Sequence, residues 1–377
     1  MQSAGILTFH TTINYGGVLQ AYALQTVLAD MGCNAEIIDY FDSEGDLSSL
    51  SPLRRLKHLV WHGLVKKMLV GTVREQRTEK FRRDHLKLSA RKYSDAALLH
   101  AEPPVYDVYI TGSDQVWNPV NNHGDSSYFL SFAPAGKRLV SYAASFGVSN
   151  LDAGYAEGYG HWLKCFDFLS TREFEGKEII YRLTGRDAEV LPDPTLLLNR
   201  EQWKRVTAPY QPSRPYILCY YMPGDKKVNR HITQLSDKLA RKTGWEVISI
   251  GQKEYMRLHP FRKTALTSGP SEFVGAFQNA SFVITNSFHG TAFAANFKVP
   301  FVVPINRAIP PEQALSSRIT TLLRILQLEC RLIDVDQPIS EALPLEVDFE
   351  NAAERLENER KRAFAFLSNV LKGQSNL

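Results

Sequence analysis

Short apolar runs alternate with helical patterns along this chain, and this alternation constrains its fold more than any other feature. In the first half, six apolar runs are each followed by a turn and usually by a helical pattern; they lie at 4–9, 35–40, 106–112, 138–147, 165–173 and 188–193. Strands that are apolar on both faces are typical of a parallel sheet covered by helices on both sides. The pattern therefore predicts an α/β fold.

The pattern restarts after a polar, proline-containing stretch at 192–215, with apolar runs at 216–222, 245–251, 281–287 and 300–304. A chain of 377 residues exceeds what one hydrophobic core usually holds. We predict two Rossmann-like domains, 1–199 and 200–348, that face one cleft. Residues 349–373 contain no helix breaker before Gly373, and by analogy with two-domain enzymes of this build we expect this terminal helix to join the first domain.

The cysteines and the N-terminal residues indicate the cellular compartment of the protein. The four cysteines lie far apart without metal-ligand spacing, which argues against a disulfide framework and against a zinc site: Cys33, Cys165, Cys219 and Cys330. The N-terminal residues lack the pattern of a signal peptide, and no window approaches the length of apolar sequence that a membrane span requires. We expect a cytoplasmic protein, with peripheral contact at the inner face of the cell membrane left open.

Ligands of open parallel sheets bind beyond the carboxyl ends of the strands, so the residues after each run are the candidates. After the first run, His10, Asn14 and Tyr15 lead through Gly16 and Gly17 into a helical pattern. Paired glycines at such a turn let the backbone approach a ligand and expose helix N–H groups. A tight turn with packing glycines is the structural alternative. The segment is not G-x-G-x-x-G, so a dinucleotide site is poorly supported.

The run at 106–112 is followed by Ser113, Asp114, Gln115, Trp117 and Asn118. Hydrogen-bonding groups beside an indole suit a sugar, whose C–H face packs on aromatic rings. Asp114 is the best carboxylate of the first domain for a general base, because it follows a strand at the expected cleft. The alternative is that Ser113 or Asp114 caps the next helix.

Two cationic side chains also follow strands. Arg172 offers a fork of donors that matches carboxylate or phosphate, although a surface ion pair with Glu173 or Glu175 would explain it equally. His289 stands between the run at 281–287 and a helix of small residues. The N–H groups and dipole of a helix N-terminus attract an anion, and a histidine can add a donor or a proton. A buried structural histidine is the alternative.

Two other nucleotide or hydrolase motifs are poorly supported. Residues 142–147, YAASFG, resemble a nucleophile elbow around Ser145, and Asp193 and His289 follow in hydrolase order. However, residues 148–158 do not give the immediate helix that the elbow requires. No P-loop pattern occurs in the chain.

Taken together, these motifs resemble the polysaccharide pyruvyl transferase family. The matching pieces occur in family order and cover most of residues 4–304: NYGGVLQAYALQ (14–25), YITGSDQVWNP (109–119), YAASFG (142–147), STREFEG (170–176), VLPDPTLLL (190–198) and ITNSFHGTAFAANFKVPFVV (284–303). The resemblance implies a fold like that of the GT-B glycosyltransferases. It also implies transfer of the pyruvyl group of phosphoenolpyruvate to a sugar of a bacterial polysaccharide or its lipid-linked precursor as a cyclic ketal.

The resemblance assigns roles to individual residues. Arg172 and His289 look like ligands of the phosphate and carboxylate of the donor. The family's triplet that ends at the histidine can begin with a basic residue, but here it begins with Ser287, so Arg318 is our candidate for a second cation. The donor set implied is Arg172, Ser287, Phe288, His289, Gly290 and Arg318, on the side of the second domain. The acceptor set is His10, Asn14, Tyr15, Gly16, Gln115 and Trp117, on the first.

The implied chemistry needs no cofactor and no divalent metal, because a carbon–oxygen bond breaks. As a hypothesis, His289 supplies or relays a proton to the methylene carbon and stabilises the departing phosphate. Asp114 or His10 accepts the proton of the sugar hydroxyl.

Residues 51–92 form a basic segment. Residues 51–100 hold thirteen Lys and Arg against four acidic residues, and Leu53, Leu56, Val60, Leu64 and Met68 recur at helical spacing. An interfacial helix resting on anionic lipid is compatible with this pattern, as is an ordinary amphipathic helix with a solvated basic face. Nucleic acid is not expected, since no recognition motif accompanies the charge.

Two other functions stay open at this point. A GT-B glycosyltransferase that uses a nucleotide sugar would share the architecture, but the segment 252–260 offers only Glu254 as a poor clue to a nucleoside site. A non-catalytic glycan-binding module would use Trp117 and cleft aromatics without binding phosphoenolpyruvate.

Overall fold

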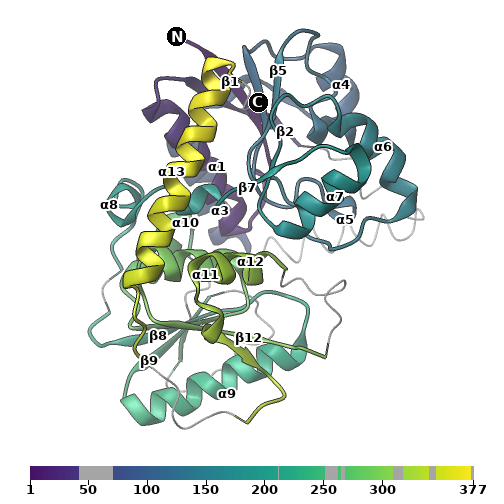
Figure 1. Cartoon of the computed structure of the whole chain (residues 1–377). Helices are drawn as coiled ribbons and strands as arrows, with labels where there is room; N and C mark the ends of the chain where they lie inside the picture. Colours follow the sequence, from purple (N-terminus) through teal and green to yellow (C-terminus); the bar gives the residue numbers. More distant parts are fainter. Residues whose placement is uncertain are drawn as a thin grey trace, which may run out of the picture. The chain divides into compact units, whose positions relative to one another are not determined.

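The computed structural model forms two compact units (Figure 1). Unit 1 comprises Met1–Leu197 with Glu359–Leu377, and unit 2 comprises Leu198–Asn358. The residues that the structure describes are 1–41, 71–210, 212–250, 262–264, 268–308, 317–338 and 345–374. The amphipathic pattern around Leu53–Met68 and the segment around Glu254 lie outside these residues.

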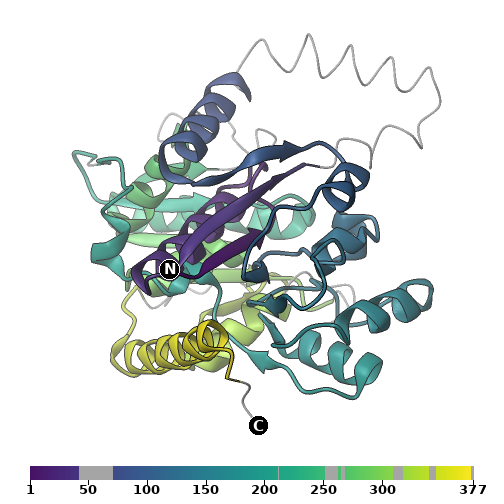
Figure 2. The ribbon, with the colours of Figure 1, turned by 90° about the horizontal axis from the view of Figure 1, so that it is seen from above.

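Unit 1 is built on a parallel five-stranded sheet in the order β3-β2-β1-β4-β5. Its strands are β1 (Ser3–Leu7), β2 (Asn34–Tyr40), β3 (Leu88–Tyr93), β4 (Val108–Thr111) and β5 (Arg138–Ser141). In Figure 2, β1 and β2 in purple and β3 in blue run side by side. All four residues of β4 are buried, as expected for a strand inside a helix-covered parallel sheet. A short parallel pair, β6 (Ser170–Thr171) and β7 (Glu189–Val190), follows.

The helices of unit 1 connect these strands. They are α1 (Tyr15–Asp30), α3 (Gly71–His85), α4 (Ala96–Ala101), α5 (Pro119–Asn122), α6 (Ala153–Leu163) and α7 (Phe174–Thr184), with 3-10 turns η2 (Ser126–Phe129) and η3 (Pro194–Leu196). Most of α1 is buried, because its Ala, Val, Leu and Gly residues leave no polar face. It contacts β2, α3 and η3.

The last helix, α13 (Glu350–Lys372), contributes its residues up to Asn358 to unit 2 and those from Glu359 onward to unit 1. Within unit 1, the Phe366 ring makes edge contacts with the rings of Tyr142 and Phe168, at centroid distances of 6.3 and 6.0 Å. Arg138 Nη1 donates a hydrogen bond of 2.6 Å to the carbonyl of Val370. The end of α13 is therefore part of the unit 1 core.

Unit 2 holds a six-stranded parallel sheet in the order β10-β9-β8-β11-β12-β13. Its strands are β8 (Tyr216–Tyr220), β9 (Glu246–Ile250), β10 (Arg262–Thr264), β11 (Phe282–Thr285), β12 (Phe301–Ile305) and β13 (Leu332–Asp334). Its helices are α8 (Arg200–Trp203), α9 (Lys226–Thr243), α10 (Pro270–Gln278), α11 (Phe288–Asn296) and α12 (Ser317–Leu326), with the turn η5 (Glu329–Arg331). In Figure 1, α9 covers one face of this sheet, and α10, α11 and α12 cover the other.

Candidate functional site

Each sheet has one point where the strand order reverses. In unit 1 the chain runs from β1 outward through β2 and β3, and then crosses to β4 on the other side of β1. In unit 2 the same reversal separates β8 from β11. Ligands of open α/β sheets bind beyond the strand ends at such switch points. Asp114 follows β4 and His289 follows β11, so each lies at the switch point of its own unit.

Asp114 has an unusual backbone. Its φ angle is 80°, in the left-handed region that few residues other than glycine adopt, and the residue is 7% exposed. A Cβ placed on Gly17, in the first turn of α1, would lie 3.2 Å from Asp114 Oδ2 and 2.5 Å from Thr12 Cγ2. Glycine at position 17 therefore lets the start of α1 approach this carboxylate closely. Strain of this kind is concentrated at functional sites.

Arg172, just beyond β6, lies beside Asp114. Arg172 Nη1 is 2.7 Å from Asp193 Oδ2, and Nη2 is 3.8 Å from Asp114 Oδ1. The side chains of Arg172 and Asp193 are 1% and 0% exposed. Ser113 Oγ donates to the same Asp193 oxygen at 2.8 Å, and Thr195 donates from its amide and its hydroxyl to Oδ1. One buried guanidinium is thus held between two carboxylates.

Glu173 does not form the surface ion pair with Arg172 that was the alternative explanation. Its Oε1 accepts hydrogen bonds from Ser145 Oγ and from the amides of Phe146 and Gly147, at 2.9, 2.8 and 3.2 Å. The Ser145 hydroxyl is fully buried and donates to a carboxylate, which is a structural role rather than that of a hydrolase nucleophile.

The structure reassigns Trp117 from the acceptor site to the core. The residue is fully buried; its ring stacks on Phe129 at a centroid distance of 5.5 Å, and its Nε1 donates to the carbonyl of Tyr128. A sugar has no exposed face of this indole to pack against. Gln115 is partly exposed, and its Oε1 accepts a hydrogen bond of 2.8 Å from Asn118 Nδ2.

His10 is fully buried, and both of its ring nitrogens have partners. Nδ1 lies 3.1 Å from the carbonyl of Thr8, and Nε2 lies 3.1 Å from Asp39 Oδ1. The hydrogen bond with His10 lowers the pKa of Asp39 below its ordinary value, against burial, which raises it; the charge of Arg82 contributes in the same direction as His10. Because both of its ring nitrogens are engaged, His10 is less suited than Asp114 to act as the base.

The remaining acceptor candidates form the start of α1. Asn14 is the N-cap residue, and its side chain accepts from the amide of Gly16 at 3.2 Å. Tyr15 is 1% exposed, with the guanidinium of Arg74 4.1 Å from the centre of its ring. These contacts fix the loop between β1 and α1, and acceptor binding by these residues stays a prediction.

Four donor candidates form the start of α11. Ser287 is its N-cap residue, and its hydroxyl accepts from the amide of Gly290 at 3.3 Å. His289 is in the first turn and 4% exposed, and the ring of Phe288 meets its ring edge-on at 5.2 Å. A Cβ on Gly290 would lie 2.5 Å from Thr285 Oγ1, so glycine allows α11 to pack tightly on the end of β11.

Arg318 is in the first turn of α12, and this helix contacts α11. The residue is 8% exposed. The structure therefore places five of the six donor candidates on two neighbouring helices of unit 2, while Arg172 belongs to unit 1 with Asp114.

The sequence did not identify the residues whose hydrogen bonds and ion pairs fix the candidate side chains in place. Asp193 was weighed as part of a hydrolase triad, and Asp39 was not singled out. Asp193 caps the η3 turn, and the Asp-Pro-Thr sequence at 193–195 is a signal for such a cap. Asn286 was also missed: its Oδ1 accepts from the amide of Met222, and its Nδ2 donates to Asn229 Oδ1, so it joins the residues after β8 and β11.

The family model of polysaccharide pyruvyl transferases matches residues 14–307, a span that includes the six sequence pieces between 14 and 303 but neither His10 nor Arg318. The chain belongs to the polysaccharide pyruvyl transferase family. No curated protein sequence matches it.

Solved structures match this family member over its whole length. A putative UDP-N-acetylglucosamine 2-epimerase from Listeria monocytogenes is 11% identical, with a TM-score of 0.52, and the match covers 98% of this chain and 97% of that one. A UDP-GlcNAc 2-epimerase from Methanocaldococcus jannaschii, in complex with UDP-GlcNAc and UDP, is 12% identical with a TM-score of 0.45, covering 95% and 99%. The expected α/β class with two Rossmann-like domains of the GT-B type is confirmed.

Two further features concern metals and membranes. In the described part of the chain, no cluster of three or more His, Cys, Asp and Glu side chains could hold a metal ion. Among those same residues, no helix combines the length and apolar character needed to cross a bilayer.

Proposed function

We propose that this family member transfers the pyruvyl group of phosphoenolpyruvate to a sugar of a bacterial polysaccharide or its lipid-linked precursor. A proton adds to the methylene carbon of the donor, which makes C2 electrophilic. One sugar hydroxyl adds to C2 and phosphate leaves. A second hydroxyl of the same sugar then closes the cyclic ketal, and both hydroxyl protons are released.

Family membership carries this proposal, and the position of His289 supports it. Phosphoenolpyruvate carries a phosphate and a carboxylate on three carbons, so it needs several donors within a small volume. The first turn of α11 offers amide N–H groups and the positive end of a helix dipole. A histidine in that turn can donate a proton or a hydrogen bond. His289 is therefore our candidate for the acid and for a phosphate ligand.

Asp114 is our candidate for the base in the same proposal. It follows a buried strand at a switch point, and its carboxylate is close to the buried Arg172 guanidinium. A carboxylate accepts a hydroxyl proton from an alcohol that lies within hydrogen-bond reach. Asp193 holds the guanidinium in place, so we assign it a positioning role.

Phosphate release from phosphoenolpyruvate tests the function. Purified full-length protein is incubated with extracts of lipid-linked and free oligosaccharides, beside His289→Ala and the control His161→Ala, which changes an exposed histidine in α6. We expect acceptor-dependent release that His161→Ala retains. His289→Ala should lose it by a factor on the order of 100 or more, the usual effect of removing a general acid.

Thermal unfolding of both variants shows whether the loss reflects chemistry or misfolding. Normal turnover by a folded His289→Ala protein would rule out the assigned role. Binding of a nucleotide sugar without binding of phosphoenolpyruvate would instead identify a glycosyltransferase.

A further inference from the structure

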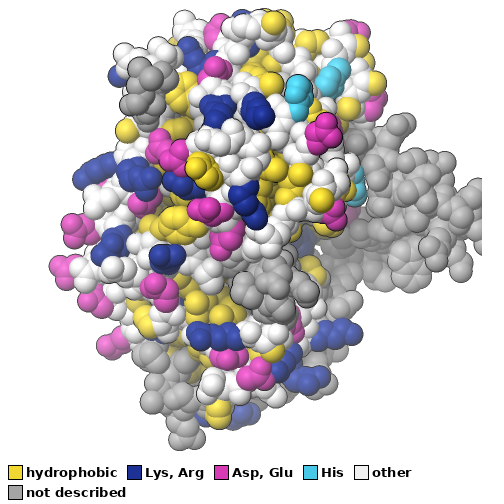
Figure 3. All heavy atoms as spheres, turned by 45° about the vertical axis from the view of Figure 1, so that its right-hand side comes forward, with side chains coloured by type: hydrophobic (Ala, Val, Ile, Leu, Met, Phe, Trp, Pro, Cys, Tyr) yellow, Lys and Arg dark blue, Asp and Glu magenta, His cyan; other side chains and the backbone are white. Residues whose placement is uncertain are grey.

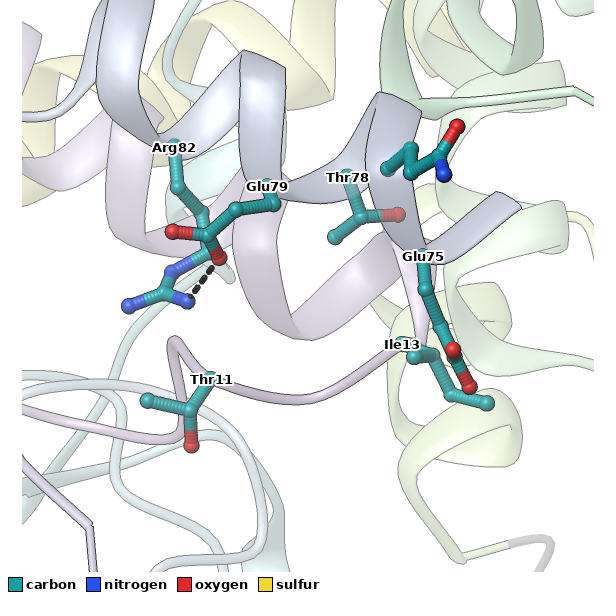
Figure 4. Close-up of a pocket in the computed structure, with 7 residues that line it drawn as sticks. Thr11, Ile13, Glu75, Thr78, Glu79 and Arg82 are labelled. Carbon is teal, nitrogen blue, oxygen red and sulfur yellow. Dashed lines mark hydrogen bonds and ion pairs between the residues drawn. The ribbon is translucent and has the colours of Figure 1, made fainter. Parts of the chain in front are cut away.

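A pocket of about 300 Å³ lies in unit 1 between the loop after β1 and helix α3 (Figure 4). Thr11 and Ile13 of the loop form one wall, and Glu75, Thr78 and Glu79 of α3 face them. Its volume is at the lower end of the range for small-molecule sites, which suits a single sugar ring better than a nucleotide.

The loop connects this pocket with the candidate base. Thr12, in this loop, lies next to Gly17, because a Cβ added to Gly17 would contact the side chains of both Thr12 and Asp114. Its two neighbours in sequence, Thr11 and Ile13, line the pocket. A ligand in the pocket would therefore lie across a single loop from Asp114.

A hydrogen bond and an ion pair fix helix α3 beside the pocket. Arg74 of α3 donates to the carbonyl of Ile13 at 2.8 Å. Arg82 lies 3.7 Å from Asp39, the partner of His10. Helix α3 is thus joined to the loop at Ile13 and to β2 at Asp39, which makes the pocket a preformed feature rather than a gap between independent segments.

The pocket also contains a buried hydroxyl without a partner. Thr78 is 4% exposed, and its Oγ1 makes no hydrogen bond with any described residue. A buried polar group without a partner is rare, and in a pocket wall it is suited to a ligand. In Figure 4, Thr78 lies between Glu75 and Glu79, whose carboxylates extend toward the loop.

The side chains that line the pocket indicate which class of ligand it can bind. Two carboxylates against the single guanidinium of Arg82 disfavour an anion such as phosphoenolpyruvate. Carboxylate, amide, hydroxyl and guanidinium groups together supply both donors and acceptors, as vicinal sugar hydroxyls require. The exposed Ile13 side chain offers an apolar surface for a C–H face.

We propose that this pocket binds a neutral sugar residue of the acceptor, with Glu75, Glu79 and the Thr78 hydroxyl as hydrogen-bonding partners. The proposal rests on the pyruvyl transfer proposed above, because it names the place where that reaction's acceptor is held. It extends the acceptor site from the start of α1 to α3.

Saturation-transfer NMR with methyl glycosides of glucose, galactose and mannose tests the pocket without phosphoenolpyruvate. Full-length protein is compared with the double variant Glu75→Gln/Glu79→Gln, with Thr78→Val, and with the control Glu157→Gln, which changes an exposed glutamate of α6. We expect at least one glycoside to bind, with Kd raised on the order of tenfold in the double variant. Glu157→Gln should leave it unchanged.

If the double variant misfolds, Thr78→Val alone still tests the pocket. It removes a hydroxyl that has no partner, so we expect an unchanged Tm and weaker glycoside binding. Equal Kd values for the original protein and Thr78→Val, or no glycoside binding at all, would overturn the pocket proposal. Phosphate release from phosphoenolpyruvate, measured on the same preparations, tests the proposed function separately. If release persists with unaltered acceptor dependence in these variants, the pocket proposal is wrong while the proposed function stands.

Discussion

At the buried residue Asp114 of unit 1, the backbone conformation costs folding free energy. Asp114 adopts a left-handed backbone, and such conformations cost about 1 to 3 kcal/mol in residues other than glycine. Glycine at position 114 would relieve that cost, but it would also remove the carboxylate next to Arg172. An aspartate in this conformation is expected where its side chain has a function.

The Asp39–His10 pair predicts an acid-dependent loss of stability. The pKa of Asp39 is lowered in the folded protein, first by the hydrogen bond with His10. A carboxyl group with a lowered pKa stabilises the fold above its unfolded pKa, about 3.9, and this contribution is lost as pH falls through the folded pKa. The stability difference between the original protein and Asp39→Asn should therefore be constant from about pH 7 to 5 and shrink below about pH 4.

Urea unfolding at a series of pH values, followed by a probe of unit 1, measures this difference. Asp84→Asn is the control, because Asp84 pairs with Lys80 at the surface, where ion pairs contribute little. A difference for Asp39→Asn that stays the same down to pH 3 would show that the pair does not depend on its charge.

Secondary-structure elements were predictable to different degrees. The apolar runs predicted ten strands of the two sheets and the small pair, but not β3, β10 and β13. β3 has three consecutive exposed residues, Ala90, Arg91 and Lys92, and β10 and β13 are three-residue strands at the edges of their sheet. Edge strands lack the two-sided burial that produces a continuous apolar run.

The positions of candidate site residues followed from the strand ends, but their partners did not. Arg172 pairs with Asp193 rather than with the adjacent Glu173, because β6 and β7 bring their two loops together. Trp117 turns into the core because η2 supplies Phe129 for stacking and the Tyr128 carbonyl for its indole. Both outcomes depend on strand pairing and packing, which local sequence does not encode.

Helix α11 gives a prediction at the level of an element. A methyl group at position 290 would lie 2.5 Å from Thr285 Oγ1 and 3.0 Å from Tyr220 Cδ1. Gly290→Ala should therefore destabilise unit 2 by about 1 to 3 kcal/mol, as overpacking usually does, and move His289. Gly154→Ala is the matched control, since its nearest neighbour would be Asp152 Oδ1 at 3.4 Å. Chemical denaturation and phosphate release measure both effects; equal stability of the two variants would show that α11 shifts without cost.

For the whole molecule, the distribution of surface charge determines which part of the chain could bind an anionic membrane. The net charge is +4, and on the face shown in Figure 3 Lys and Arg side chains are interspersed with Asp and Glu. In the described part of the basic segment, several cations are paired, as Lys87 is with Glu36 and Arg91 with Glu102. Any binding to anionic lipid should then depend on residues 51–70.

Vesicle sedimentation tests whether the basic segment contacts a membrane. If the segment rests on anionic lipid, the protein should bind vesicles that contain phosphatidylglycerol and not those of phosphatidylcholine alone, with binding weakened by salt; no binding to either would favour the solvated helix. Replacing Arg54, Arg55, Lys57, Lys66 and Lys67 by glutamine should weaken binding more than tenfold, since each such charge contributes about 1 kcal/mol. Replacing Lys204 and Lys238 of unit 2 is the control. Binding that the first set of replacements leaves intact would rule out this segment as the lipid contact.

The division of α13 has a consequence for the order in which the protein forms during synthesis. Unit 1 contains the first residues of the chain and also Ala363, Leu367 and Val370, all fully buried. Domains usually fold one after another as they leave the ribosome. Here the core of unit 1 is completed only after unit 2 has been translated, because α13 covers the apolar surface around Tyr142 and Phe168. A chaperone that shields nascent apolar surface would have to protect this part of unit 1 throughout the synthesis of unit 2.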